Sequence, residues 1–275
     1  KDGKIETLCS TKSLVNNARS ICFSLDGDTL FIGNDNANNY VANPVAVGMV
    51  TRKGGFKDLK SYIPSEKLAQ PHINGIAVNP VDGSLFTYHW GRHVFRYNKA
   101  TETCEYVITR DQFNELVVGL FPDADGNMQN IGGDGGYGGL AFSPDGKTLY
   151  FCTAGARPIP KEFSEIKYSL CSIAFDPDTR SFGSVVDTLY NANTAGQSVS
   201  FPRVSPDGKH LMYTVSGYGN FSIWHKDADL YMADLSTGES VPLDILNSDD
   251  VESYHSWSSN SRWVIFSSRR IDGLC

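Results

Sequence analysis

One short pattern of apolar and polar positions recurs along the chain: two segments with alternating apolar residues flank a tight polar turn. The clearest copies are residues 138–151 and 201–214, in which a Ser-Pro-Asp-Gly turn separates the two segments. Alternation with a period of two is typical of half-buried β-strands, and Asp-Gly accepts the positive φ that a tight hairpin turn needs. The pattern therefore predicts repeated β-hairpins.

The hairpin occurs five times, at intervals of roughly 60 residues. Its turns contain Asp26, Asp82, Asp145, Asp207 and Asn260. Further strand patterns follow the hairpins, for example residues 170–175 with 184–190, and these complete four-stranded units. A ring of such units protects nearly every strand edge, which is the principle of a β-propeller. We predict an all-β chain, one β-propeller domain over residues 1–275 with five four-stranded blades, six being the alternative.

The two ends of the chain complement each other in this pattern. Residues 4–9 have the pattern of an outer strand without an inner hairpin before it, whereas the last hairpin, residues 254–268, has no outer strands after it. We therefore expect the N-terminal strand to join the last blade and close the ring. The alternative is a chain cut at one or both ends.

The charge of the chain and the spacing of its cysteines limit the kinds of partner and of metal or disulfide site that we expect. The chain has 24 Lys and Arg against 31 Asp and Glu, a net charge of −7, and no basic cluster longer than a pair, so a nucleic-acid partner is not expected. No apolar run is long enough to be a transmembrane segment. The six cysteines show no CxxC spacing and several lie in apolar runs, which favours buried free thiols over disulfides or a metal site. We expect a monomer.

The amino-acid sequences of the later hairpins resemble those of a known family. The strings at residues 142–151, 200–208, 223–231 and 253–263 are similar to the WD-like propeller repeats of TolB-type proteins, and residues 136–275 resemble bacterial TolB-like envelope proteins throughout. Residues 1–135 look more like NHL-type propeller repeats. The resemblance implies a location in the periplasm or at the outer membrane of a Gram-negative bacterium, with an envelope protein, a peptide or a glycan as partner.

Two motifs suggest cofactors. Gly133, Gly135 and Gly138 have GxGxxG spacing, but a dinucleotide fingerprint opens a helix, whereas this tract precedes a predicted strand. A second motif places oxygen ligands at the spacing of a calcium loop, with Met128 where an EF-hand needs glycine. Its four candidate ligands are Asp123, Asp125, Asn127 and Asp134. We expect a solvated turn and no cofactor, with calcium as the alternative.

Polar and aromatic residues gather before the inner strands, where a propeller surrounds one mouth of its axial channel. The candidate ligand-binding residues are Arg19, His72, Asn74, Tyr137, Tyr254 and His255. They offer a cation, amide and imidazole donors and an aromatic face, which suit a carboxylate-bearing peptide or a sugar. The chain has no GxSxG or HExxH motif.

We therefore predict a non-enzymatic recognition module that binds at the channel mouth or the loop face. Three alternatives stay open. The polar groups at the channel mouth could serve only to contact water or the backbone, without binding a ligand. The protein could be a propeller enzyme of the lactonase or glycan-processing type with a metal in the channel. It could also be a structural scaffold that uses its outer face.

Overall fold

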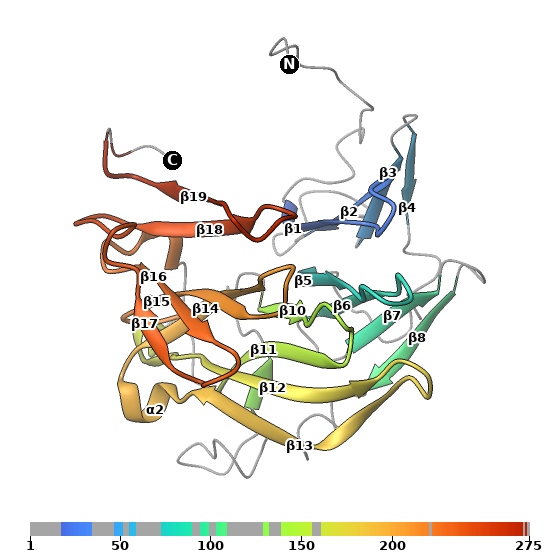
Figure 1. Cartoon of the computed structure of the whole chain (residues 1–275), viewed down its shortest axis with the longest axis horizontal. Coiled ribbons are helices and arrows are strands. Elements are labelled where there is room, and N and C mark those ends of the chain that lie inside the picture. Colours follow the sequence, from blue (N-terminus) through green and yellow to red (C-terminus); the bar gives the residue numbers. More distant parts are fainter. Residues whose placement is uncertain are drawn as a thin grey trace. The chain divides into compact units, whose positions relative to one another are not determined.

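A computed structural model describes eleven segments of the chain: residues 18–34, 47–51, 55–58, 73–89, 94–98, 103–108, 129–131, 139–155, 161–219, 222–271 and 273. In these segments nearly all regular structure is antiparallel β-sheet (Figure 1). The chain divides into two compact units. The first comprises Lys1–Asn79 and Gly83–Ile108, and the second comprises Pro80–Asp82 and Thr109–Cys275.

The first unit contains two sheets, each with four strands in chain order. Sheet 1 consists of β1 (Ala18–Phe23), β2 (Thr29–Asn34), β3 (Val47–Thr51) and β4 (Phe56–Asp58). Sheet 2 consists of β5 (Ile73–Val78), β6 (Leu85–His89), β7 (Val94–Asn98) and β8 (Thr103–Ile108). Neighbouring strands are antiparallel throughout, so each sheet is a simple meander.

The second unit contains three more sheets. Sheet 3 consists of β10 (Leu140–Phe142), β11 (Thr148–Gly155), β12 (Ser169–Asp176) and β13 (Ser181–Tyr190), with β9 (Gln129–Ile131) paired to β11. Sheet 4 consists of β14 (Ser198–Val204), β15 (His210–Ser216), β16 (Asp229–Asp234) and β17 (Ser240–Pro242). Sheet 5 is the hairpin of β18 (Glu252–Trp257) and β19 (Val264–Ser268).

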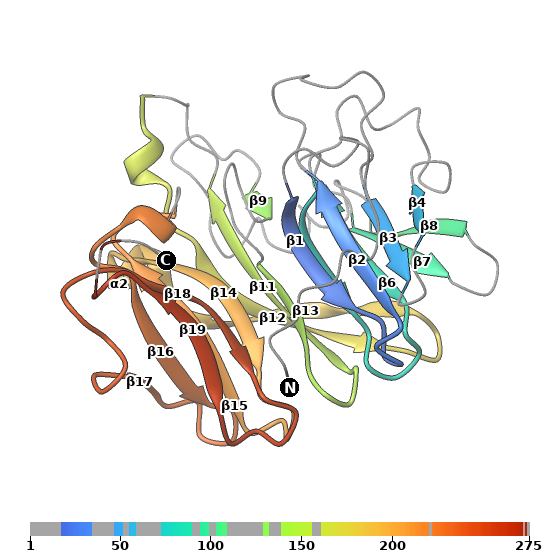
Figure 2. The ribbon, with the colours of Figure 1, turned by 90° about the horizontal axis from the view of Figure 1, so that it is seen from above.

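Within the second unit, sheet 4 lies between the other two sheets. Its inner strand β14 contacts both β10 and β18, and the three sheets follow one another in Figures 1 and 2. Short helical turns complete the unit: η3 (Phe163–Glu165), α2 (Ala192–Ala195) and η4 (Ser222–Trp224). The order of the sheets along the chain is therefore also their order in space within this unit.

The predicted hairpin turns form as expected, because side chains and backbone cooperate locally. In the turn of sheet 3, Ser143 Oγ donates to Asp145 Oδ1 at 2.5 Å, and the same oxygen accepts from the amide of Lys147 at 3.0 Å. Gly146 takes φ 68°, which a residue with a Cβ adopts at a cost. The hydrogen bond from Ser143 is also the main cause of the lowered pKa of Asp145.

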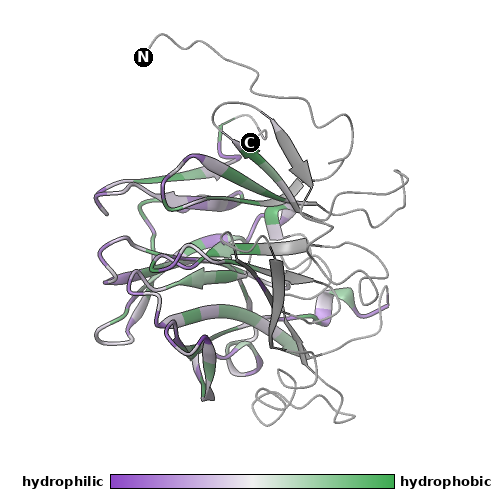
Figure 3. Cartoon of the chain, turned by 90° about the vertical axis from the view of Figure 1, so that its right-hand side faces the viewer, coloured by the Kyte–Doolittle hydropathy of each residue, from purple (hydrophilic) through white to green (hydrophobic). Residues whose placement is uncertain are grey.

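The core of the second unit lies where sheets 3 and 4 face each other. Tyr150, Leu170, Val199 and Leu211 are among its buried members, and apolar residues concentrate along these strands (Figure 3). Burial of such side chains is the main favourable term that holds one sheet against the next. The alternating pattern seen in the sequence therefore marks the faces where the two sheets pack.

Cys152 and Cys171 are buried free thiols, as predicted. Burial raises the pKa of Cys152, and it raises that of Cys171 to about 12, so both stay protonated and act as small apolar side chains. Among the residues that the structure describes, no helix is long and apolar enough to cross a membrane. Residues 4–9 lie outside the described segments, so the predicted ring closure stays a prediction, as does the single domain.

Candidate functional site

The first strand of each hairpin is its inner strand, that is, β1, β5, β10, β14 and β18. Four of these strands, β1, β5, β14 and β18, show a shift of pairing register. The shifts lie between Ala18 and Ser20, Ile73 and Gly75, Ser200 and Arg203, and Ser253 and Ser256. A bulge of this kind bends its strand and re-aims a side chain. It occurs at the end of the inner strand where the sequence predicts the channel mouth.

In the second unit the bulges hold two aromatic residues in an unusual backbone conformation. Phe201 in β14 has φ 54° and Tyr254 in β18 has φ 49°. An aromatic residue at positive φ costs about 1–3 kcal/mol, so the surroundings must hold it there. The two rings contact each other with centroids 4.9 Å apart. Phe201 is buried whereas Tyr254 is 47% exposed, so the pair presents one aromatic face to solvent on a buried support.

The next residue, His255, lies on the buried side of β18. It is 3% exposed, and its Nε2 is 3.0 Å from the carbonyl oxygen of Met212 in sheet 4. Burial, together with the charge of Arg203, lowers the pKa of His255 to about 3. The ring is therefore neutral near pH 7, and Nε2–H donates to the carbonyl. The side chain joins sheets 4 and 5 and is buried, whereas the sequence predicts it at the solvent-exposed channel mouth.

The loop that joins β15 to β16 adds further groups beside Phe201. Ser200 Oγ and Ser222 Oγ, both buried, lie 3.2 Å apart and link β14 to η4. Two residues further on, Trp224 is 64% exposed, and Arg269 Cζ lies 5.8 Å from the centre of its ring. Arg269 is itself oriented, since its Nε donates to the Gly273 carbonyl at 2.7 Å. An exposed indole and a guanidinium therefore stand together.

The same loop is tied to sheet 3. The amide of Gly219 donates to the Ile166 carbonyl at 2.6 Å, and a Cβ at this glycine would lie 2.1 Å from the ring of Tyr168. Only glycine fits this close approach. The ring of Tyr218 contacts those of His225 and Phe163, with centroids 3.9 Å and 5.6 Å away. These contacts of Tyr218 and Gly219 hold the loop between β15 and β16 in place.

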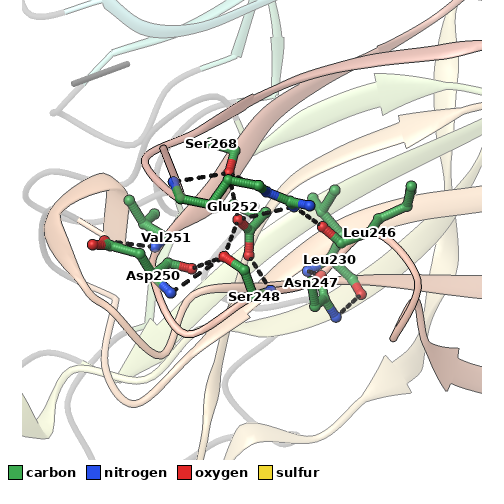
Figure 4. A network of polar contacts seen from close by, with 9 residues as sticks. Leu230, Leu246, Asn247, Ser248, Asp250, Val251, Glu252 and Ser268 are labelled. Atoms are coloured by element: carbon green, nitrogen blue, oxygen red, sulfur yellow. Dashed lines mark hydrogen bonds and ion pairs between the residues drawn. The ribbon is translucent and has the colours of Figure 1, made fainter. Parts of the chain in front are cut away.

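Below this loop, a buried carboxylate fixes the start of β18 (Figure 4). Glu252 accepts hydrogen bonds from the amide and hydroxyl of Ser248 at 2.9 and 2.7 Å and from the hydroxyl of Ser268 at 2.6 Å. Arg270 Nη2 lies 3.2 Å from the same carboxylate and also donates to the Leu246 carbonyl. The network ties the segment before β18 to the end of β19.

We call the residues Ser200, Phe201, Ser222, Trp224, Tyr254 and Arg269 the bulge site. Three contacts join them in pairs, Ser200 with Ser222, Phe201 with Tyr254, and Trp224 with Arg269, and the pairs are connected along the chain in β14 and in η4. Two exposed aromatic rings suit stacking against a sugar or a peptide side chain, and the guanidinium suits a carboxylate.

The structure separates the residues predicted at the mouth. Tyr254 is exposed within the bulge site, whereas His255 is buried beneath it. Arg19 and Asn74 lie in β1 and β5 of the first unit, each within the register shift of its strand. The remaining predicted site residues lie outside the described segments: His72, Tyr137, Asp123, Asp125, Asn127 and Asp134. Ligand binding by any of them stays a prediction.

Five members of the bulge site are not among the candidate residues from the sequence: Ser200, Phe201, Ser222, Trp224 and Arg269. Phe201 could have been found, since it occupies the same place relative to its turn as Tyr254 does. Trp224 and Arg269 belong to different loops and carry no spacing that links them. In the described part of the chain, no group of three or more His, Cys, Asp or Glu side chains is arranged to hold a metal ion.

Comparison with known proteins supports the fold. No protein-family model matches the chain, and no curated protein sequence is significantly similar to it. Among solved structures, the Dos1 propeller matches 92% of this chain with 13% sequence identity and a TM-score of 0.52. This likeness confirms the predicted fold class: the chain is an all-β protein of the β-propeller type.

Two further structures are less similar. An auxiliary nutrient binding protein from Bacteroides thetaiotaomicron has 15% identity over 83% of the chain and a TM-score of 0.49. An oligogalacturonate lyase from Vibrio parahaemolyticus has 12% identity over 90% of the chain and a TM-score of 0.47. The chain spans 47%, 56% and 69% of the nutrient binding protein, the Dos1 propeller and the lyase, that is, about half the length of the first two.

Proposed function

We propose that the chain is a non-enzymatic recognition module that binds a peptide, a protein segment or a glycan at the bulge site. The observation that carries this proposal is the backbone conformation and the exposure of Tyr254. Its backbone is held at positive φ on a buried aromatic support, and its ring is turned to solvent. Strain of this kind collects at ligand-binding positions, where it positions a side chain in advance.

The chemistry of the neighbouring groups defines the ligand class. An aromatic face binds the apolar side of a sugar ring or a peptide side chain, and both Tyr254 and Trp224 offer one. Arg269, oriented by its bond to Gly273, can pair with a carboxylate in a bidentate way. A ligand with a flat apolar face and a carboxylate would use all three groups.

The location in the envelope of a Gram-negative bacterium is part of this proposal. It is supported by the resemblance of the hairpins to TolB-type repeats, as in residues 200–208. The TolB-like and NHL-like subtypes of the two halves belong to the same proposal. Cell fractionation of a Gram-negative bacterium producing the protein tests the location, with recovery in the cytosolic fraction as the contradicting result.

The binding proposal is tested with two substitutions at one position. Tyr254→Gly removes the ring but suits the positive φ, so the fold should persist, whereas Tyr254→Phe keeps the aromatic face. Arrays of neutral and acidic oligosaccharides and of short carboxylate-bearing peptides identify a ligand, and calorimetry measures its affinity. We expect Tyr254→Gly to weaken binding roughly tenfold or more, the effect of one lost aromatic contact of about 1.4 kcal/mol, and Tyr254→Phe to bind as the wild type does.

Trp263→Ala is the matched control. This ring is exposed as well, but Trp263 lies at the turn between β18 and β19, whereas Tyr254 lies near the start of β18. Its loss should leave the affinity unchanged. Equal affinity of the wild type and Tyr254→Gly for every array ligand would contradict the proposal, and turnover of a bound oligosaccharide would show an enzyme instead.

A further inference from the structure

Two adjacent arginines follow β19 directly, and their side chains are engaged in different ways. Arg270 is held within the protein, since its Nη2 lies 3.2 Å from Oε1 of Glu252 and also donates to the Leu246 carbonyl. Arg269 forms no ion pair with any residue that the structure describes, and its guanidinium stands over the exposed ring of Trp224. Of these two cations, Arg269 is therefore the one that a ligand carboxylate can use.

The carboxylate of Glu252 holds the residues on both sides of Arg269 (Figure 4). On one side, Ser268 Oγ donates to Oε1 at 2.6 Å, and on the other, Arg270 pairs with the same oxygen. The amide of Arg269 itself donates to the carbonyl of Val251, the residue before Glu252, at 3.3 Å. Three consecutive residues are therefore fixed relative to the start of β18.

The same residue is connected to the two exposed aromatic rings of the bulge site. Tyr254 follows Glu252 by two residues in β18. The amide of Glu252 donates to the Ala228 carbonyl at 2.8 Å, and the amide of Ala228 donates to the carbonyl of His225 at 3.1 Å. His225 is the residue next to Trp224. The segments that carry the guanidinium, the phenol and the indole are therefore all tied to one residue.

We propose that Glu252 is a positioning residue of the bulge site, which aims Arg269 at the carboxylate of a ligand. The inference rests on the proposed function and names the residue that makes the site selective for acidic ligands. Glu252 is fully buried and does not touch a ligand, so it acts through the residues that it holds. A guanidinium forms two parallel hydrogen bonds with a carboxylate only when its plane is correctly oriented. Loss of this hold should therefore weaken the binding of carboxylates and spare neutral ligands.

The network around Glu252 needs a carboxylate, because all of its side-chain partners donate. The amide of Ser248 donates to Oε2, whereas the hydroxyls of Ser248 and Ser268 and the guanidinium of Arg270 donate to Oε1. A glutamine side chain has one acceptor oxygen and an NH2 group that only donates. In either orientation this NH2 group would face the amide of Ser248 or the guanidinium of Arg270. Glu252→Gln therefore keeps the size of the side chain and breaks the network.

The test compares two probes of the same size, N-acetylphenylalanine and N-acetylphenylalaninamide, which differ in having a carboxylate or a neutral amide. NMR titration measures both dissociation constants for each protein, and their ratio gives the selectivity. We expect the wild type to bind the carboxylate about tenfold more tightly, the effect of one charge-assisted pair. Arg269→Gln and Glu252→Gln should both lose this preference, while their affinity for the amide stays within about twofold of the wild type.

Ser268→Ala is a second, milder variant, which keeps Glu252 and removes one of its donors beside Arg269. We expect its selectivity to fall to about threefold, because the other contacts of the carboxylate remain. Ser267→Ala is the matched control, since Ser267 is half-buried in the same strand and lies opposite Ser253 instead of Glu252. It should keep the selectivity of the wild type. Guanidinium unfolding shows whether each variant is folded.

The positioning role is overturned if the wild type binds neither probe or both equally, or if Glu252→Gln keeps the preference for the carboxylate. Equal weakening of both probes in Glu252→Gln would show a purely structural role and overturn it as well. If Glu252→Gln does not fold, unchanged selectivity in Ser268→Ala overturns the role. The proposed function fails on a different result, a Tyr254→Gly variant that binds every array ligand as the wild type does.

Discussion

His255 shows how one buried side chain makes stability depend on pH. Its pKa is about 3 in the folded chain and about 6.5 in an unfolded one. The unfolded chain therefore binds more protons between these values, so stability is complete above pH 6.5 and falls as the pH falls toward 3. The slope from this residue is at most about 1.4 kcal/mol per pH unit.

We predict that His255→Gln flattens this acid dependence, because glutamine can donate to the Met212 carbonyl but does not titrate in this range. Urea unfolding of both proteins at pH 4, 5, 6 and 7 measures the slopes. Identical slopes would show that His255 is not buried as described. The difference in unfolding free energy between the two proteins at pH 7 gives the loss of stability that the different shape of the glutamine side chain causes.

At the residue scale, the sequence predicts Tyr254 and His255 together at the mouth, whereas in the structure Tyr254 is exposed and His255 is buried. Successive side chains of a strand point to opposite faces, so Tyr254 and His255 could not both face the mouth. The positive φ of Tyr254 and Phe201 was also not predicted, since residues with a Cβ rarely adopt it and the sequence shows no sign that the two rings pack together.

At the scale of elements, the carboxylate of Glu252 holds three segments together. It is fully buried, accepts from Ser248 and Ser268, and pairs with Arg270. We predict that Glu252→Ala destabilises the protein by about 2 kcal/mol, because the change leaves the half-buried hydroxyls of Ser248 and Ser268 without their acceptor. Guanidinium unfolding measures the loss.

The matched control is Asp250→Ala, two residues away. Asp250 Oδ1 accepts a hydrogen bond from the amide of the next residue, Val251, at 2.9 Å, and the loss of this local contact should cost under about 1 kcal/mol. Equal destabilisation by the two changes would mean that the network does not join β18 to β19.

The hairpin turns and the bulges differ in how far the sequence predicts them. The turns follow from contacts within five residues, such as the pair of Ser143 and Asp145, so their chemistry is readable in the sequence. A register shift depends on what packs against the strand, as Phe201 against Tyr254, and leaves no local signal. Trp224 and Arg269 meet for the same reason, through the folding of distant loops.

At the scale of the molecule, the repeat length and the alternating strands were sufficient to predict a propeller, because each unit repeats the same pattern of buried faces. How the last sheet is completed was not predictable in the same way. Ile265 of sheet 5 looks like any other core position in the sequence, and its exposure of 79% distinguishes it from its equivalent Met212 in sheet 4.

The fate of residues 4–9, predicted as a strand on the edge of β19, depends on the same question. We predict that deleting residues 1–12 lowers the Tm if these residues close the ring, because the deletion would then expose an edge of the last sheet. Thermal unfolding of the full chain and of the deleted protein measures the difference. An unchanged Tm would contradict the predicted closure and make the segment a tail without a structural role in the last sheet.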